Sequence, residues 1–413
     1  LKFYMESSLK LHSPPDWLDS TFCKNAIFGC VEIESFDVYL ALPPGSNYVS
    51  DVYRVHVKYT DFKRKSTILS LFVKSPNSNA NQYTKEMGVF VTERNFYCNV
   101  LPLFDEFYTG APITPKYYYS LINNFTFAIE DLTENGYVMA NRDGFVNYEH
   151  CVECIKVLAK LHAVSAAVDE KYPFVMEEAG SRGYFCNLNL RKIIDSVLLV
   201  VADEIEQFTD LKQYSLKLRR FNLILWDSMK KCARKKVGRI NVLNHGDAWI
   251  NNFMFKYDDN NAVIDVKLID FQILNFGSPG YDLQMFLTSA VDIDVRKNKL
   301  NELLHLYLLI FNKTLRDCGS LVELSMEELH SEFYKADCVG IFTIAVHLLL
   351  TLVESIAPET PSEEEDFYLD NVYSVEKHPY KSLIRRCERY RKTLSRFLEY
   401  FDERGLFDMK INM

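Results

Sequence analysis

The chain has 413 residues, of which 48% are hydrophobic and 25% are charged. This length suits two domains or one large two-lobed unit, and the ordinary globular composition excludes a disordered or collagen-like chain. Lys and Arg number 47 against 56 Asp and Glu, so the formal net charge is −9. Because an acidic chain is a poor general binder of nucleic acid and of anionic membranes, we expect neither as a partner.

No segment is predicted to span a membrane. The longest apolar stretch, residues 340–353, is shorter than the roughly 20 residues that a span needs, and it contains His347. The first residues, LKFYMESSLKLHSPPDW, show no apolar core followed by small residues, so no secretory signal is predicted. The pair Cys151 and Cys154 lies in a helical pattern without a second CxxC, which favours buried thiols. We therefore expect a cytoplasmic protein.

The first 130 residues are predicted to be rich in strands. Apolar and polar residues alternate between Val49 and Tyr59, and residues 68–74 and 125–130 are two further strand candidates. Between them, apolar residues of the segment 84–100 recur at intervals of three, four or seven, which predicts a helix.

From residue 148 onward the pattern is mostly helical. Helices are predicted over 148–168, 190–208, 211–236, 297–315, 326–356 and 380–404. One hairpin interrupts them, with strands at 252–257 and 263–269 joined by a polar turn. The order of elements predicts an α+β fold with a β-rich N-terminal lobe and a mostly helical C-terminal lobe.

The strongest chemical signal flanks this hairpin. Asp247 follows His245 and Gly246, Asn252 comes five residues later, and Asp270 ends the second strand. Phosphoryl transfer needs a carboxylate at the acceptor hydroxyl and oxygen ligands for Mg²⁺. Each motif alone is also consistent with an ordinary turn. In this order, the residues predict Asp247 as the catalytic carboxylate and Asn252 and Asp270 as the catalytic metal ligands.

The segments LNHGDAWINNFMFKY and VKLIDFQILNFGSPGYDLQMFL resemble the insect ecdysteroid kinase-like family. GSNYVSDVYRV, ERNFY, FAIEDLTENGY and LAKLHA extend the resemblance over roughly residues 22–400. That family belongs to the choline kinase and aminoglycoside phosphotransferase group, which shares the protein-kinase-like fold. The resemblance implies ATP and Mg²⁺ as cofactors.

The resemblance also implies a nucleotide site in the N-terminal half. The loop that contains Ser50 matches the family's phosphate-covering loop, although it has one glycine and is not GxGxxG. Lys74 ends a predicted strand, where its amine would reach the phosphates. Glu93 in ERNFY matches the glutamate that pairs with this lysine. Glu86 is seven residues earlier on the same helical face and remains an alternative.

The segment FTFAIEDL is implied to be the hinge between the lobes, where backbone groups near Glu130 and Leu132 would bind adenine. His245 is interpreted as a support of the catalytic loop, with a role as general base as the alternative. His162, on an apolar helix face, is interpreted as a core histidine. Asp282 begins a helix and is predicted to cap it, or to hold the catalytic loop by hydrogen bonds.

We expect an N-terminal extension over 1–21, a nucleotide-binding lobe over 22–132 and a helical lobe over 133–413 that contains the catalytic hairpin 243–276. The resemblance implies a kinase that phosphorylates a hydroxyl of a lipophilic small molecule, such as an ecdysteroid. A choline- or aminoglycoside-type kinase and a pseudokinase binding module are the alternatives. A protein kinase is disfavoured, because HRD and DFG segments are missing and Phe271-Gln272 stands where Phe-Gly would be. The acceptor and the oligomeric state are left open.

Overall fold

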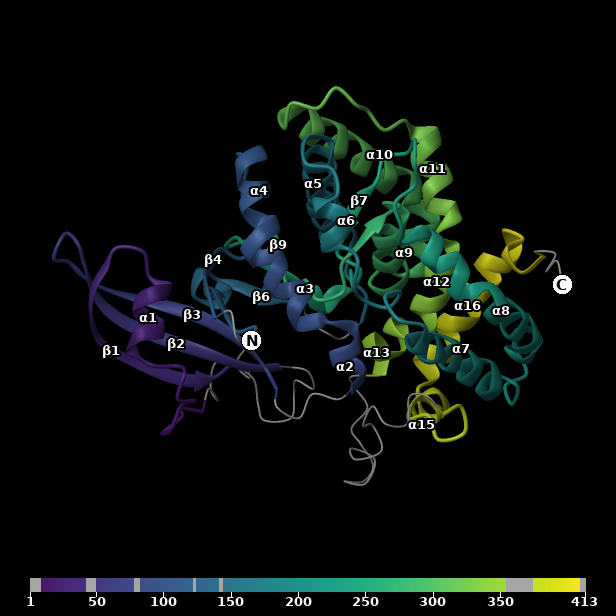
Figure 1. The fold of residues 1–413 in the computed structure, drawn as a ribbon. Helices are drawn as coiled ribbons and strands as arrows, with labels where there is room; N and C mark the ends of the chain where they lie inside the picture. Colours follow the sequence, from purple (N-terminus) through teal and green to yellow (C-terminus); the bar gives the residue numbers. More distant parts are fainter. Residues whose placement is uncertain are drawn as a thin grey trace. The chain divides into compact units, whose positions relative to one another are not determined.

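The structure is a computed structural model that describes residues 9–41, 50–77, 82–121, 124–140, 144–353 and 374–408. Contacts divide the chain into two compact units, of which the first is rich in strands and the second is mostly helical (Figure 1). The first unit comprises Leu1–Pro102, Gly110–Val138 and Met254–Gln272, and the second comprises Leu103–Thr109, Met139–Phe253 and Ile273–Met413. The predicted α+β class, with a β-rich N-terminal part and a helical C-terminal part, is confirmed.

An antiparallel sheet of five strands forms the centre of the first unit. Its strand order is β1-β2-β3-β5-β4, with bounds Cys30–Leu40 (β1), Ser50–Asp61 (β2), Ser66–Pro76 (β3), Phe127–Glu130 (β5) and Tyr117–Ser120 (β4). The strands predicted at 49–59, 68–74 and 125–130 correspond to β2, β3 and β5. Strand β1 was not predicted, because acidic residues interrupt its apolar pattern and most of its side chains are at least partly exposed.

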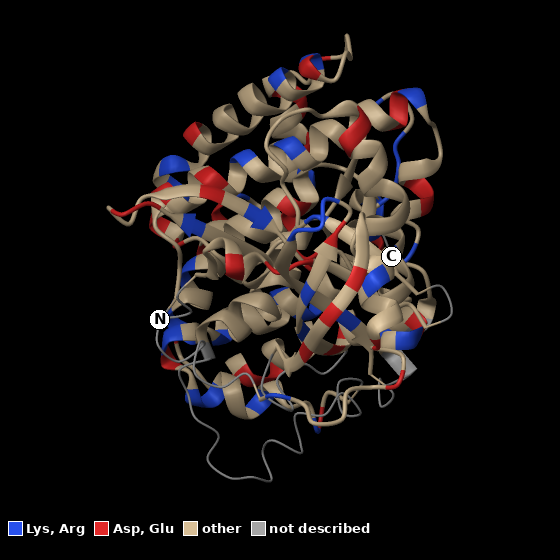
Figure 2. Cartoon of the chain, turned by 90° about the vertical axis from the view of Figure 1, so that its left-hand side faces the viewer, with Lys and Arg blue, Asp and Glu red and all other residues tan. Residues whose placement is uncertain are grey.

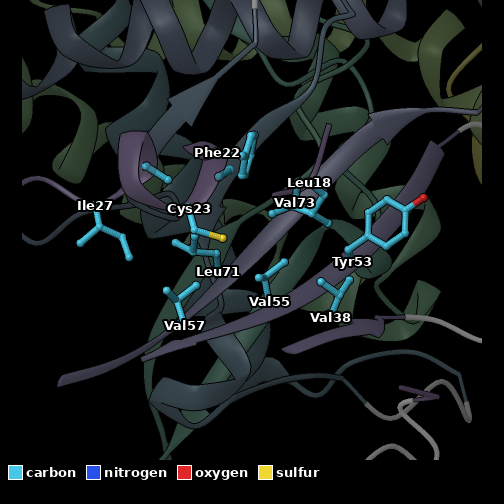
Figure 3. Close-up of a cluster of buried hydrophobic side chains, with 12 residues drawn as sticks. Leu18, Phe22, Cys23, Ile27, Val38, Tyr53, Val55, Val57, Leu71 and Val73 are labelled. Carbon is cyan, nitrogen blue, oxygen red and sulfur yellow. The ribbon is translucent and has the colours of Figure 1, made fainter. Parts of the chain in front are cut away.

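Helix α1 (Ser20–Ala26) covers one face of this sheet. Phe22 and Cys23 of the helix pack against buried side chains of the strands, among them Val55 of β2 and Val73 of β3 (Figure 3). Successive side chains of a strand point to opposite faces. Because Val73 faces α1, its neighbour Lys74 lies on the other face of the sheet, and so does Val52, its cross-strand partner on β2.

The helical segment that follows β3 is divided into short pieces. It consists of α2 (Gln82–Met87), α3 (Val89–Asn95), a π-helical turn (Phe96–Val100) and α4 (Leu101–Phe107). The prediction of one continuous helix over 84–100 is therefore wrong. Gly88 lies between α2 and α3 with φ at +68°, a left-handed conformation that a helix interior does not allow and that glycine adopts without steric cost.

A second sheet contains the predicted hairpin. Its strand order is β6-β8-β9, with bounds Tyr137–Met139, Phe253–Tyr257 and Val263–Leu268. The structure thus differs from the predicted boundaries, which assigned the whole hairpin to the helical lobe. Residues 254–272 belong to the first unit. Strand β9 is connected to another segment of this unit by a hydrogen bond, in which the amide of Leu268 donates to the carbonyl of Ile113 at 2.9 Å.

The predicted N-terminal extension, 1–21, also differs from the structure where it is described. Lys10 forms a β-bridge with Tyr39 of β1, and the amide of Leu11 donates to the carbonyl of Val38 at 2.9 Å. Leu18 is buried in the core under the five-stranded sheet. Residues 9–21 are therefore part of the first unit.

The second unit is built from helices around a short two-stranded sheet. The strands are β7 (Val242–Asn244) and β10 (Asn275–Gly277), which pair antiparallel. The larger helices are α5 (Tyr148–Lys171), α7 (Arg191–Ile205), α8 (Ser215–Cys232), α9 (Gly280–Ser289), α10 (Ile293–Asp317), α11 (Met326–Lys335), α12 (Asp337–Ala345), α13 (His347–Val353), α15 (Tyr380–Arg386) and α16 (Glu388–Glu403). Helix α5 packs along α10, and all ten residues of α9 are buried.

Two predictions for this unit need correction or addition. The helix predicted over 326–356 is interrupted at Ala336 and Val346 and gives α11, α12 and α13 in its described part. A helix start was expected at Asp282, but the extent of α9 was not predicted, because this helix is buried on all sides and therefore lacks separate apolar and polar faces. Cys151 and Cys154 are buried within α5 and form no disulfide, in line with the interpretation as structural thiols.

Charges are mixed along the molecule. Figure 2 shows basic and acidic residues interspersed over the strands and helices in this view. Within the described ranges, no helix combines the length and the apolar character needed to cross a membrane.

One buried histidine makes the stability of the second unit sensitive to acid. His378 is 3% exposed, and its Nδ1 accepts a hydrogen bond from the amide of Tyr380 at 3.2 Å, at the start of α15. Burial, together with the nearby charge of Lys381, lowers the pKa of His378 from 6.5 to about 4. The folded state therefore holds this imidazole neutral where the unfolded chain would protonate it.

We expect the resulting penalty to be absent above about pH 6.5, to grow as the pH falls and to be complete below about pH 4. His378→Asn keeps an oxygen acceptor for the amide of Tyr380 but does not titrate. Between pH 7 and pH 4.5, the variant should lose about 2 to 3 kcal/mol less unfolding free energy than the wild type in urea titrations. His305→Asn, at an exposed position, is the matched control, and equal losses in all three proteins would contradict this account.

Candidate active site

A buried ion pair forms the core of the candidate site in the first unit. Lys74, at the end of β3, is 8% exposed, and its Nζ lies 2.6 Å from Oε2 of Glu93 on α3. The alternation along β3 turns Lys74 away from α1 and toward this helix. The structure brings Glu93, rather than Glu86, to the lysine. A buried charge without a partner is costly, so the pair holds both side chains in one place.

Asp270 joins this pair. It follows β9 by two residues, and its Oδ1 bonds with Nζ of Lys74 and with Nε2 of Gln272. For the other oxygen, Oδ2, no hydrogen bond is seen among the described residues, and the side chain is 27% exposed. The backbone of Asp270 has φ at +70°, an uncommon conformation for a residue other than glycine. Such strained positions cluster at functional sites, where the surroundings hold them.

The strained turn is held by aromatic packing. The ring of Phe271 is fully buried and stacks on Phe96, with ring centres 3.8 Å apart and planes 9° apart. Tyr97 meets the same ring edge-on, with its ring centre 6.0 Å away. Because Phe96 and Tyr97 directly follow α3, this packing ties the turn at Asp270 to the helix that carries Glu93. Sequence reasoning did not identify Phe271 as part of the site.

The buried group of Lys74, Glu93 and Asp270 contains two acidic side chains and one basic side chain. Burial acts to lower the pKa of Lys74, but the charges of Asp270 and Glu93 outweigh it and raise this pKa above its ordinary value. Burial and the charge of Asp270 raise the pKa of Glu93 to about 7, against the opposing effect of Lys74. Two carboxylates thus share one amine. A further cation next to Asp270 would balance the group, which makes the donor set suitable for Mg²⁺.

The proposed phosphate loop is only partly described. Residues 42–49 lie outside the described ranges, so the structure does not address Gly45. Ser50 begins β2 and is 2% exposed, and its Oγ has no hydrogen-bond partner among the described residues. Ser50 lies on the same sheet face as Lys74, because Val52 is directly opposite Lys74 and Ser50 is two residues before it. A buried hydroxyl without a partner is suited to a phosphate oxygen.

The predicted hinge segment is held by Asp131. This carboxylate accepts hydrogen bonds from Nε of Arg54 at 2.6 Å and from Oγ of Ser70 at 2.7 Å, and it caps the 3₁₀ turn that begins at Leu132. Burial acts to raise its pKa, but these bonds prevail and lower it. The amide of Glu130 donates to the carbonyl of Lys116 at 2.8 Å. Glu130 could therefore offer an adenine its carbonyl but not its amide.

In the second unit, Asp247 and Asn252 lie on the loop between β7 and β8. The Nδ2 of Asn252 donates to Oδ2 of Asp247 at 3.0 Å and to the carbonyl of Asp247 at 2.8 Å. Both partners only accept, so the amide nitrogen of Asn252 faces them and its oxygen is directed elsewhere. An amide oxygen oriented in this way suits a metal ligand. The side chain of Asp247 is 18% exposed.

The loop itself is held by the buried carboxylate of Asp282 on α9. Its Oδ2 accepts from the amide of His245 at 2.6 Å, and its Oδ1 accepts from the amide of Gly246 at 2.9 Å. His162 also bonds to Asp282, at 3.1 Å, and to the hydroxyl of Tyr307, at 2.8 Å. These contacts agree with the interpretation of His162 as a core histidine. They also agree with the role predicted for Asp282 in holding the loop.

Gly246 allows the loop to approach its neighbour closely. Its φ is +78°, and a Cβ at this position would lie 1.8 Å from the carbonyl oxygen of Ile273. No side chain fits against a backbone atom at that distance. The spacing in His-Gly-Asp therefore has a steric reason: glycine lets the loop pass the chain before β10, and Asp247 follows directly. His245, immediately before it, is completely buried, which agrees with a supporting role for this residue.

Sequence reasoning missed one polar partner of Asp247. The Nε2 of His347, at the start of α13, lies 2.9 Å from Oδ1 of Asp247. Burial acts to raise the pKa of Asp247, but the hydrogen bond from His347 and the other polar neighbours lower it below its usual value. The sequence signal was a lone histidine in the apolar stretch 340–353. That signal was interpreted only as a reason to reject a membrane span.

Known proteins give one family match and several distant structural likenesses. The model of the ecdysteroid kinase-like family matches residues 44–320. None of the curated proteins matches the chain. An ethanolamine kinase from Plasmodium vivax is 14% identical, with 85% of this chain and 82% of that chain covered and a TM-score of 0.39. A microcompartment-associated aminopropanol kinase is 11% identical, with 91% and 98% covered and a TM-score of 0.41. Likenesses this distant say nothing of the substrate.

The family match includes Ser50, Lys74, Glu93, the loop at Asp247 and the turn at Asp270, and it spans well over half of the chain. The matched segment, residues 44–320, is shorter than the segment of roughly residues 22–400 over which the sequence was expected to resemble the family. The match supports a phosphotransferase that acts on small molecules. The chain belongs to the ecdysteroid kinase-like family.

Proposed function

We propose that the protein is an ATP- and Mg²⁺-dependent kinase that phosphorylates a hydroxyl group of a lipophilic small molecule, with an ecdysteroid or a similar alcohol as the acceptor. The observation that carries the proposal is the state of Asp247, which is a partly exposed carboxylate held by a hydrogen bond on each of its two oxygens. Phosphoryl transfer depends on positioning and charge more than on covalent chemistry, and a side chain held in this way meets that need.

In the first unit, we assign Lys74, Glu93, Ser50 and Asp270 to the nucleotide and its metal. When bound, the Mg²⁺ complex of ATP supplies the phosphoryl group and the positive charge that balances it. Lys74 contributes a fixed positive charge, because Glu93 holds its amine. Asp270 contributes the carboxylate oxygen that Lys74 and Gln272 leave unbonded, and Ser50 contributes a hydroxyl donor. The Glu130 carbonyl and the Leu132 amide are assigned to adenine.

In the second unit, Asp247 would accept a hydrogen bond from the acceptor hydroxyl and take its proton as the new P–O bond forms, while the bond between the γ-phosphorus and the bridging oxygen breaks and ADP leaves. Asn252 holds one carboxylate oxygen with its amide nitrogen, and we assign its own oxygen as a ligand of the metal. Mg²⁺ commonly uses one or two protein side chains and completes its shell with water and phosphate oxygens. Within the described ranges, no group of three or more His, Cys, Asp or Glu residues is arranged to hold a metal.

The surroundings of Asp247 favour an apolar acceptor. His347, which bonds to the carboxylate, has Trp249 at 5.7 Å and Phe342 at 6.0 Å between ring centres, and Tyr184 packs on Phe342 at 5.8 Å. Trp249 and Tyr184 are partly exposed. Aromatic faces also attract quaternary ammonium groups, so a choline-like acceptor is the natural competitor in the test below.

Label transfer from γ-labelled ATP tests the proposal. With Mg²⁺ present, the wild type should label an ecdysteroid or a comparable lipophilic alcohol in a panel that also contains choline and an aminoglycoside. Asp247→Asn keeps the shape of the side chain but removes the proton acceptor, so kcat should fall roughly 10²- to 10⁴-fold with little change in nucleotide affinity. Asp259→Asn, in the exposed turn between β8 and β9, is the matched control.

The other outcomes of this panel separate the alternatives. Transfer to choline or the aminoglycoside alone would replace the lipophilic acceptor by a cationic one. Nucleotide binding without transfer to any acceptor would indicate a pseudokinase. Wild-type turnover by Asp247→Asn would contradict the role of this carboxylate.

Nucleotide titrations test the metal role of Asp270. Asp270→Asn preserves the size of the side chain but removes its negative charge, so the affinity for ATP in the presence of Mg²⁺ should fall at least about tenfold. Without divalent metal, the affinities of variant and wild type should be similar. An equal response of both proteins to Mg²⁺, measured by calorimetry, would remove Asp270 from the metal site.

A further inference from the structure

His347 contacts Asp247 from a distant part of the chain. The two residues are 100 positions apart, and the imidazole reaches the carboxylate because α12 ends at Ala345 and α13 begins at His347. At Val346, between the two helices, φ is −112° and ψ is −75°, which departs from regular helix geometry. The interruption thus places the single histidine of an apolar segment at the candidate catalytic loop.

The direction of this hydrogen bond follows from its partners. An ionised carboxylate only accepts, so Nε2 of His347 carries the proton and donates to Oδ1 of Asp247. The other ring nitrogen, Nδ1, is buried and has no hydrogen-bond partner among the described residues. The side chain of His347 is 5% exposed, against 18% for Asp247. The carboxylate is therefore the member of the pair that an acceptor molecule can reach.

The contact completes a set of restraints on Asp247. Asp282 holds the backbone on the N-terminal side of Asp247, at His245 and Gly246. Asn252 holds Oδ2 from the C-terminal side of the loop. Oδ1 has only His347 as a described partner. Without His347, rotation about the Cα–Cβ and Cβ–Cγ bonds of Asp247 would be restrained at one oxygen only.

We propose that His347 is a positioning residue for Asp247: its Nε2–H group fixes the orientation of the carboxylate toward the acceptor hydroxyl. This inference rests on the proposed function and extends it to a residue outside the catalytic loop. His347 does not receive the acceptor's proton, because its free ring nitrogen is buried beside Phe342 and Trp249. Loss of the bond should therefore affect the rate of transfer and leave nucleotide binding unchanged.

Two substitutions separate the hydrogen bond from the packing of the ring. His347→Phe keeps an aromatic ring between Trp249 and Phe342 but has no donor. His347→Gln carries an amide donor near the position of Nε2. With the acceptor that the wild type phosphorylates, kcat of His347→Phe should fall about 10- to 100-fold, the range expected for a lost hydrogen bond to a charged group. KM for ATP should stay within about twofold, and His347→Gln should recover most of the lost rate.

Thr351→Val is the matched control, because Thr351 lies one turn further along α13 and is 4% exposed. Its hydroxyl has no partner among the described residues, so the isosteric change removes a buried polar group without touching Asp247. We expect wild-type kcat and an equal or higher melting temperature. The melting temperature of every variant is measured alongside its kinetics.

The outcomes decide between positioning and structural support. A wild-type kcat in His347→Phe would overturn the inference. Equal losses of kcat in His347→Phe and His347→Gln, in proportion to the decrease in their melting temperatures, would also overturn it. Packing alone would then explain the effect. A wild type that transfers label to no acceptor would instead overturn the proposed function. In that case the bond itself is tested by ¹⁵N spectra of the imidazole, which should show the Nε2–H tautomer in the wild type and lose it in His347→Phe. An Nδ1–H tautomer would contradict the contact.

Discussion

A charged side chain that is taken out of water must be paired or hydrogen-bonded, and both parts of the candidate site are built on this constraint. In the first unit the buried amine of Lys74 requires Glu93 and Asp270. In the second unit the carboxylate of Asp282 has no exposed surface and takes hydrogen bonds from two loop amides and from His162. In each unit the buried charge fixes a segment that no regular ladder of hydrogen bonds would hold.

These buried charges explain how a turn and a loop can hold the side chains of Asp270 and Asp247 in fixed positions. The turn at Asp270 has a left-handed residue, yet it is fixed by the ion pair on one side and by the stacking of Phe271 on Phe96 on the other. The loop at Asp247 is fixed by Asp282 through its backbone and by Asn252 and His347 through the carboxylate. Preorganised groups pay their ordering cost during folding rather than during the reaction. A kinase for small molecules depends on preorganised side chains, because its rate comes mainly from the positioning of the reacting groups.

The two units distribute the chemical tasks of the proposed reaction. The group around Lys74 sets the two carboxyl groups of Glu93 and Asp270 against one amine, which suits a metal–nucleotide complex better than a free phosphate. Around Asp247 and its hydrogen-bond partners, the described residues include the aromatic rings of Trp249, Phe342 and Tyr184. A charged donor and a largely apolar acceptor would thus meet different environments, each determined by residues of one unit.

The residue types and their order already predicted much of this protein. Alternation in β2 and β3 identified two central strands, and the spacing of His245, Asp247, Asn252 and Asp270 identified the candidate loop and turn, because local geometry is repeated at fixed intervals along a chain. Strand β1 escaped prediction because it is too polar, and the extent of helix α9 was not predicted because a helix that is buried on all sides shows no period. Tertiary structure alone decided that β9 belongs with the first unit, that Phe271 stacks on Phe96, and that His347 meets Asp247. Such contacts join residues that are distant in sequence, and packing rather than any local pattern determines which of them become neighbours.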